Sequence, residues 1–196
     1  MEIWQQEEYP IIDQLAEEEN AEIYFVDETG VQNTTNYVKG YAPIGKTPVV
    51  SVEAKKMRVN VISAVSNKGK MRYMIYLDNM NADNLITFIK RLIKGTTNKV
   101  FLILDNLRVH HSKKVKEWVE KNNAKIKLFF LPPYAPEYNP GEYLNSDLKR
   151  GVGNRPMPKT EKDIMYNIHS HLKKVQLRPW KIMAFFKTKS THYARQ

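Results

Sequence analysis

Cysteine is absent from this chain of 196 residues. The protein therefore forms no disulfide, uses no thiol nucleophile and holds no zinc ion through cysteine. Apolar runs as long as the roughly 20 residues of a membrane-spanning helix are also absent, and the first residues lack the basic flank and apolar centre of a signal peptide. We therefore expect a protein that stays inside the cell and does not engage a membrane.

Basic residues are missing from the first part of the chain. Residues 1–38 contain ten Asp or Glu and no Lys or Arg, whereas the remaining 158 residues contain 31 basic and 11 acidic side chains, a balance of +20. A basic body predicts a polyanionic partner such as a nucleic acid, because Lys and Arg displace the counterions that surround phosphates. On charge alone, a generally soluble basic surface remains the alternative.

Strand and helix signals alternate after residue 20. Segments rich in apolar and β-branched residues predict strands at 21–26, in the β-rich stretches 47–52 and 58–65, and at 71–77, 100–104 and 126–131. Periodicity and capping residues predict helices at 81–93, 112–122, from 140 onward, 160–175 and 179–186. The order βββαβαβα followed by a helical tail predicts an α/β domain with a mixed sheet. Ser112 is expected to cap the second helix, and residues 151–156 to form a flexible link.

Three acidic residues stand where predicted strands end or a helix begins. Asp27 follows the first predicted strand and is expected to open a turn through Gly30. Asp105 follows an all-apolar run that predicts a central strand. Glu142 is expected in the first turn of a helix that Asn139 caps, after a loop stiffened by prolines.

These carboxylates converge if the strands before Asp27 and Asp105 lie side by side and the proline loop brings Glu142 beneath them. Such a set can hold two divalent cations about 3.5–4 Å apart, which activate a nucleophile and stabilise the leaving oxygen at a phosphodiester. Taken singly, each acid has an ordinary alternative as a turn former or a helix N-terminal residue. Asp78 repeats the Leu-Asp-Asn tripeptide of Asp105, but helix capping accounts for it.

Four motifs together give the chain a family resemblance. They are Val-Asp-Glu-Thr-Gly at 26–30, Tyr-Ala-Pro-Ile-Gly-Lys-Thr-Pro at 41–48, Leu-Asp-Asn at 104–106 with His-His-Ser at 110–112, and Leu-Pro-Pro-Tyr-Ala-Pro-Glu-Tyr-Asn-Pro-Gly-Glu at 131–142. Over residues 4–193 the chain resembles the DDE transposases of bacterial insertion sequences, and among these the mariner-related branch known as the IS six-thirty group. The 36 residues between Asp105 and Glu142 are similar to the short spacing of that branch.

The resemblance implies an RNase H-like fold with a five-stranded mixed sheet, helices on both faces and a helical C-terminal tail. It also implies that Asp27, Asp105 and Glu142 are the catalytic residues and the ligands of two Mg²⁺ or Mn²⁺ ions. The family cuts DNA at terminal inverted repeats and joins the freed 3′-hydroxyl to a TA target. The implied partners are therefore transposon-end and target DNA, without a small-molecule substrate. A homodimer and a bacterial cytoplasmic location at the nucleoid follow from the same resemblance.

Further residues are candidates for contacts with DNA. Asn106 and His110 match family positions beside the second aspartate, where a histidine contacts phosphate, orients water or simply packs. Lys149 lies two helical turns after the predicted catalytic glutamate and so on nearly the same helix face, with Arg150 next to it. Tyr134, in the proline loop, is expected to stack on a base or to cover the edge of the core.

The predicted organisation is an acidic arm at 1–20, a catalytic domain at 21–150 and a basic helical extension at 151–196 that packs on it. Residues 143–196 contain twelve Lys or Arg and three acidic residues, which predicts a surface that contacts the DNA backbone. Full-length relatives carry helix-turn-helix domains before the catalytic core, and the chain is expected to lack them. Two functions stay open: an active transposase core, or a catalytically silent fragment that binds DNA or dimerises.

Overall fold

The computed structural model describes residues 3–33, 41–46 and 56–195. Its regular elements, in chain order, are η1 (Trp4–Glu8), α1 (Tyr9–Glu18), β1 (Ala21–Gln32), β2 (Arg58–Val65), β3 (Met71–Tyr76), α2 (Ala82–Lys94), β4 (Lys99–Leu104), η2 (Arg108–His111), α3 (Lys113–Lys121), β5 (Ile126–Phe130), η3 (Pro136–Tyr138), α4 (Gly141–Gly153), α5 (Glu161–Gln176), α6 (Pro179–Ala184) and η4 (His192–Ala194). The predicted strand at 47–52 lies outside the described residues. Within them, no helix has the length and apolar character needed to span a membrane.

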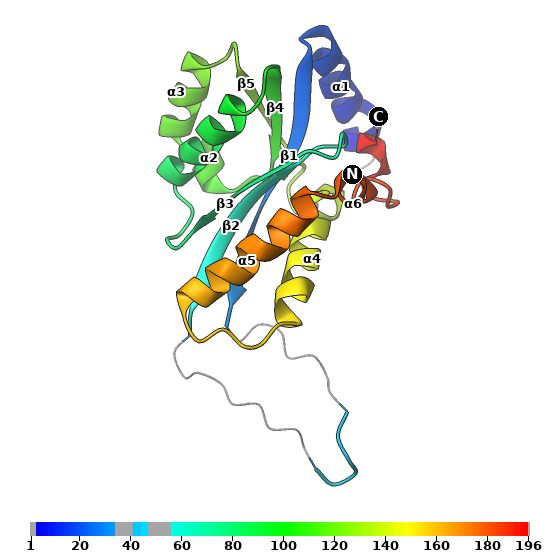
Figure 1. Ribbon diagram of the computed structural model, residues 1–196. Coiled ribbons are helices and arrows are strands. Elements are labelled where there is room, and N and C mark those ends of the chain that lie inside the picture. The colour runs from blue at the N-terminus through cyan, green and yellow to red at the C-terminus, as the bar shows by residue number, and fades with distance from the viewer. Residues whose placement is uncertain (1–2, 34–40, 47–55, 196) are drawn as a thin grey trace.

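The five strands form one mixed sheet in the order β3-β2-β1-β4-β5 (Figure 1). β1 is antiparallel to β2, and β2 to β3, which are joined by a tight hairpin with Gly69 at a φ of 74°. β4 lies parallel to β1, and β5 lies parallel to β4 with α3 as the crossover helix. These observations confirm the βββαβαβα order, the mixed sheet and the adjacency of the first and fourth strands.

Strand β1 is longer than the sequence suggested. The predicted turn at Asp27–Gly30 is wrong, because the strand continues to Gln32. Its parallel pairing with β4 ends at Phe25, but its antiparallel pairing with β2 continues to the end of the strand. Val31 also buries its side chain, so the alternating pattern of a strand persists beyond the acids. Asp27 therefore lies inside β1, just past the point where β4 leaves it.

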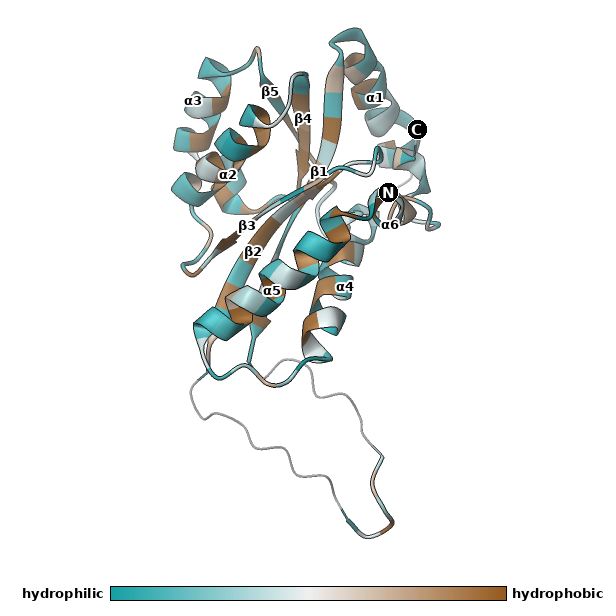
Figure 2. Ribbon diagram, in the orientation of Figure 1, coloured by the Kyte–Doolittle hydropathy of each residue, from teal (hydrophilic) through white to brown (hydrophobic). Residues whose placement is uncertain are grey.

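Two hydrophobic cores lie on opposite faces of the sheet (Figures 1 and 2). One contains the buried faces of α1, α4, α5 and α6, and the other contains those of α2 and α3. The central strand β4 contributes to both, because Phe101 and Ile103 face the first core whereas Leu102 and Leu104 face the second. The result is a three-layer α/β/α domain with helices on both faces of the sheet, as predicted.

Two local predictions are wrong. Helix α4 continues through Gly153, so residues 151–153 complete a helix instead of beginning a flexible link. Gly151 lets this last turn of α4 pack closely against α5, because a Cβ at that position would collide with the ring of His171 on α5. Ser112 occupies the N-cap position of α3, but its hydroxyl makes no capping hydrogen bond.

The acidic N-terminal segment is held to the domain by aromatic side chains. Trp4 and Tyr9 are buried, and their rings lie 6.3 Å and 4.8 Å from the ring of Tyr193. The hydroxyl of Tyr193 donates to the backbone oxygen of Tyr138 at 2.8 Å. One aromatic cluster therefore joins the two ends of the described chain, which lie near each other in Figure 1.

Candidate active site

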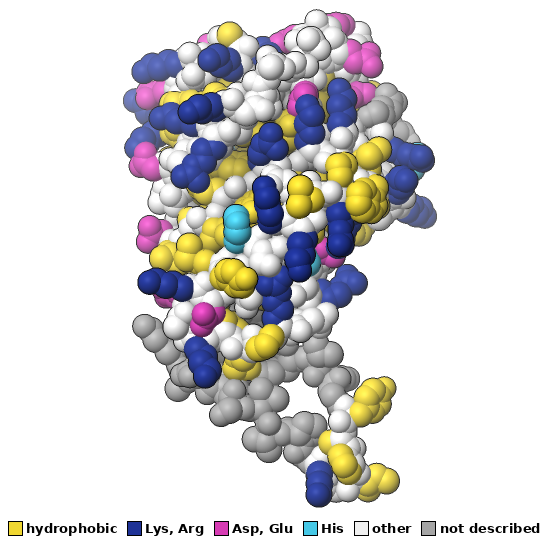
Figure 3. Space-filling model, viewed as in Figure 1, with side chains coloured by type: hydrophobic (Ala, Val, Ile, Leu, Met, Phe, Trp, Pro, Cys, Tyr) yellow, Lys and Arg dark blue, Asp and Glu magenta, His cyan; other side chains and the backbone are white. Residues whose placement is uncertain are grey.

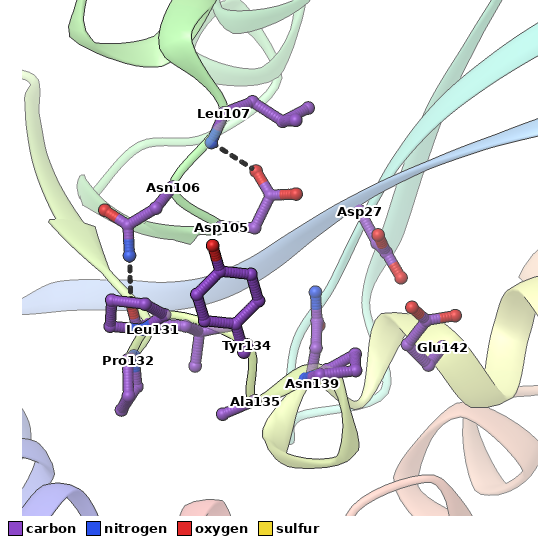
Figure 4. A pocket seen from close by; sticks show the side chains of 12 residues that line it. Asp27, Asp105, Asn106, Leu107, Leu131, Pro132, Tyr134, Ala135, Asn139 and Glu142 are labelled. Carbon is purple, nitrogen blue, oxygen red and sulfur yellow. Dashed lines mark hydrogen bonds between the residues drawn. The ribbon is translucent and has the colours of Figure 1, made fainter.

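Asp27, Asp105 and Glu142 line one cavity of about 350 Å³. Figure 4 shows Asp27 from β1 and Glu142 from α4 pointing toward each other, while Asp105 enters from the end of β4. The remaining walls are largely apolar and come from the loops after β4 and β5: Asn106, Leu107, Leu131, Pro132, Pro133, Tyr134, Ala135, Pro136 and Asn139. Three separate segments of the chain thus bring their acids to one cavity.

A second cavity, of about 430 Å³, shares the same three acids. Its other walls are mostly polar and come from β1, β2, the end of β3 and the segment after it, the segment after β4, and α4: Glu28, Thr29, Gly30, Arg58, Asn60, Tyr76, Asn79, Met80, Leu107 and Lys149. The acids therefore stand at the boundary between an apolar cavity and a polar one.

The Asp27 carboxylate is fixed by two hydrogen bonds. Its Oδ1 accepts from the backbone N–H of Glu28 at 2.8 Å, and its Oδ2 accepts from the side-chain amide of Asn145 at 2.8 Å. Burial, followed by the negative charges of Glu142 and Asp105, raises the pKa of Asp27 to about 8, although the hydrogen bond from Glu28 opposes the rise. The carboxylates repel one another across the cavity, and a cation between them would relieve this repulsion.

His110 links Asp105 to Glu28. Its Nδ1 lies 3.0 Å from Oδ1 of Asp105, its Nε2 lies 3.0 Å from Oε1 of Glu28, and its side chain is only 2% exposed. Burial alone would lower the pKa of His110, but the hydrogen bonds to the two acids outweigh it and raise the pKa to about 9. The structure thus places His110 between Asp105 and Glu28, buried and bonded to both acids.

Helix α4 begins directly against β1. Asn139 donates through Nδ2 to the backbone oxygen of Val26 at 3.0 Å and accepts at Oδ1 from the N–H of Gly141 at 2.9 Å. Its side chain thus binds the first N–H of α4, although the helix begins one residue later than expected and Pro140 occupies the N-cap position. A Cβ at Gly141 would lie 2.6 Å from the Cβ of Asp27. The absence of a side chain at this position therefore lets the helix approach β1 and sets Glu142 beside the strand.

Asn145 and Glu28 are site residues that the sequence argument missed. Asn145 stands three residues after Glu142, so helical spacing places both on the same face of α4. That spacing was an available signal for a partner of the three acids. Glu28 offered no comparable signal, because its partner His110 is 82 residues away in the chain.

The two cavities offer the carboxylate oxygens that hard divalent cations prefer. Across the described ranges, no three His, Cys, Asp or Glu side chains are grouped closely enough to enclose an ion by themselves. Mg²⁺, however, commonly keeps several waters and is held by one or two carboxylates together with substrate phosphate oxygens. An open set of carboxylates, close enough for repulsion to raise the pKa of Asp27, fits ions bound in this way.

The other predicted contact residues are distributed around the same region. Asn106 and Tyr134 line the apolar cavity, and Lys149 lines the polar one. Tyr134 is fully exposed with a φ of 57°, an uncommon conformation for a residue other than glycine. Arg150 is exposed on α4 but lines neither cavity, and Asp78 also lines neither.

Several solved structures share this fold. The chain of the Mos1 mariner paired-end complex with Mn matches at a TM-score of 0.66 and 13% identity, over 95% of this chain and 60% of that one. The catalytic domain of Mos1 mariner transposase matches at 0.54 and 14% identity, over 89% of this chain and 88% of that one. The HTLV-2 integrase catalytic core domain in complex with magnesium matches at 0.51 and 14% identity, over 83% and 95%. These likenesses define an RNase H-like α/β fold, as the sequence resemblance implied.

The family follows from the sequence match. The model of the DDE superfamily endonuclease family matches residues 22–165, which is more than half of the chain. The chain therefore belongs to the DDE superfamily endonucleases. It spans about 60% of the Mos1 chains in the paired-end complexes. A search of curated proteins found no match to the chain.

Proposed function

We propose that the protein is the catalytic domain of a transposase that cleaves DNA strands at transposon ends and transfers them to target DNA. The observation that carries this proposal is the meeting of three carboxylates, from β1, β4 and α4, in one cavity of a DDE-family chain. Mos1 chains of similar fold are transposases in complex with transposon ends. The Mos1 complex contains Mn and the HTLV-2 integrase core contains magnesium, which supports Mg²⁺ or Mn²⁺ as the cofactor.

In this proposal Asp27, Asp105 and Glu142 are the catalytic residues and the metal ligands. Two bound ions would activate a water or a 3′-hydroxyl and stabilise the leaving oxygen. Asn145 holds the Asp27 carboxylate in place through its side-chain amide, and His110 holds Asp105 from below. Both supporting residues act on the ligands and do not touch DNA.

The DNA lies over the two cavities and the basic elements around them. We assign contacts with the DNA to Asn106 and Tyr134 at the apolar cavity, and to Lys149 and Arg150 on α4. Lys and Arg side chains also spread over α5 and its neighbours on the face seen in Figure 3, where acidic side chains are few. This basic surface suits the phosphate backbone of DNA.

The more specific parts of the proposal rest on the motif at 131–142. Its resemblance to the mariner-related branch of bacterial insertion sequences leads us to propose a TA target, a homodimer as the working form and a place in the bacterial cytoplasm at the nucleoid. The alternative function is a silent fragment that binds DNA or an intact transposase. The three acids favour an active enzyme, because a protein that only binds DNA has no physical need for a carboxylate set that opposes a polyanion.

Metal-dependent nicking tests the function directly. We expect purified protein to nick supercoiled plasmid with Mn²⁺ or Mg²⁺, and excess EDTA to abolish nicking, because the carboxylates alone supply no activated nucleophile. Agarose gels of nicked and linear products give the measurement. Binding without cleavage of any DNA, including pre-nicked transposon-like ends, would favour the silent fragment.

DNA affinity is expected to fall steeply with salt. If roughly six phosphates are contacted, raising the salt from about 50 to 200 mM lowers the affinity by about 10³-fold, because bound phosphates release counterions. Fluorescence anisotropy of a labelled duplex at several salt concentrations measures the slope. An affinity that hardly responds to salt would show that phosphates are not the main contacts.

A further inference from the structure

Arg58 is a cation in the polar cavity that pairs with none of the acids around it in the described part of the chain. The cavity carries four carboxylates, from Asp27, Glu28, Asp105 and Glu142. The hydrogen bond of Arg58 runs instead from its Nε to Oδ1 of the neutral Asn60, at 2.8 Å. Arg58 is an exposed residue, and it lines the polar cavity.

The place of Arg58 is set from two sides. Asn60 is 6% exposed and donates through Nδ2 to the backbone oxygen of Asp78 at 2.9 Å, which aims its Oδ1 at the guanidinium. On the other side, a Cβ at Gly30 would lie 2.5 Å from Nε and 2.8 Å from both Cζ and Nη2 of Arg58. The planar group therefore lies over a glycine that leaves room for it. An arginine held in this way loses little conformational freedom when it binds a ligand.

On the basis of the proposed function, we propose that Arg58 binds a phosphate of the DNA backbone in the polar cavity, beside the carboxylates. The fork of an arginine matches two phosphate oxygens, and a phosphate also meets Lys149 from the α4 side of the same cavity. The apolar cavity, walled by prolines and Tyr134, offers no such cation and suits the sugar or base of a neighbouring nucleotide. The bound strand thus crosses the three acids from one cavity to the other.

The binding test needs no catalysis. A labelled DNA duplex is titrated at several salt concentrations in Ca²⁺, with wild type, Arg58→Gln and Arg91→Gln. Arg91 is an equally exposed arginine on α2 that lines neither cavity. We expect Arg58→Gln to reduce the slope of log affinity against log salt by about 0.9, the value for one lost phosphate contact, and Arg91→Gln to leave it unchanged. An unchanged slope in Arg58→Gln overturns the proposal.

A second test compares the nicking rates of variants at Arg58 and at Gly30. Arg58→Gln is expected to lower the nicking rate by about 10- to 100-fold, which is the effect of losing hydrogen bonds to a charged group. The nicking rate of Arg58→Lys should lie between those of Arg58→Gln and wild type. Gly30→Ala keeps every charge but displaces the guanidinium, whose flexible end can move without unfolding the strand. If Gly30→Ala acts through Arg58, it lowers the rate in the same direction, and the double variant loses little more than Arg58→Gln alone.

The outcomes separate this inference from the proposed function. If wild type nicks DNA and Arg58→Gln nicks equally well, or if the two single effects multiply in the double variant, the assignment of Arg58 fails while the transposase proposal stands. If wild type binds but never nicks, the transposase proposal fails, and the salt slope still decides whether Arg58 holds a phosphate. Thermal unfolding of each variant shows whether the fold is retained.

Discussion

Replacing Asp105 with asparagine is expected to lower the rate of metal-dependent nicking by about 10³-fold or more. Asparagine keeps the shape of the side chain and an oxygen that can accept from the N–H of Leu107, which now bonds Oδ1 of Asp105 at 3.2 Å. It removes the negative charge that the proposed ions need, and a loss of several kcal/mol of charge stabilisation corresponds to a factor of this size. Single-turnover nicking with Mn²⁺ gives the measurement.

Asp78→Asn is the matched control for this variant. Asp78 also follows a strand in a Leu-Asp-Asn tripeptide, but it lines neither cavity. We expect its asparagine variant to nick at the wild-type rate. Asp78→Asn should unfold at a temperature close to that of wild type, because Asp78 is exposed, whereas Asp105→Asn should unfold at a somewhat lower temperature, because the buried His110 loses one of its two charged partners. Wild-type activity in Asp105→Asn would remove this residue from the site, and an equal loss in both variants would point to a general effect of charge.

Gly141→Ala is expected to reduce nicking by about 100-fold and to lower the free energy of unfolding by about 1–3 kcal/mol. The added Cβ would meet the Cβ of Asp27 at 2.6 Å, so helix α4 must move away from β1 or Asp27 must turn. Displacements of about 1 Å in a catalytic group cost about 100-fold in rate, and overpacking costs about 1–3 kcal/mol. The higher helix propensity of alanine offsets little of this cost, because that propensity applies to helix interiors and Gly141 is the first residue of α4.

Gly95→Ala separates the clash from the general effect of an added methyl group. Gly95 ends α2, and a Cβ there would meet its neighbours at 3.5 Å, an ordinary contact. Its alanine variant should match wild type in nicking rate and in the free energy of unfolding measured by chemical denaturation. If Gly141→Ala also behaves like wild type, the close approach of α4 to β1 does not position the acids, and the site geometry has another source.

The sequence predicted those parts of the fold that depend on local patterns. The apolar run of β4 and the hairpin strands β2 and β3 were found within about one residue of their bounds, because buried strands and tight turns leave local signals. Helix α1 was missed, although its buried residues Tyr9, Ile12 and Ala16 follow helical spacing. Acidic residues separate the apolar positions of this segment in the sequence, and they obscure its apolar face.

The candidate site was predictable only in its outline. Order and spacing marked Asp27, Asp105 and Glu142, and the structure brings them to one cavity. The continuation of β1 past Asp27 could not be read locally, because it depends on pairing with β2, which begins more than 25 residues later in the chain. The bonds of His110 to two acids likewise depend on tertiary contacts, so no local pattern could predict them.

The departure of β4 from β1 after Phe25 has a consequence for motion. Before Phe25 the strand pairs with β4 and after it with β2, so Phe25 alone pairs on both edges; just beyond it, the Asn139 side chain binds the backbone oxygen of Val26 on the side that β4 has left. The gap between the acids of β1 and β4 can then widen or narrow through side-chain contacts alone, so the carboxylates can follow a changing substrate while the sheet stays intact.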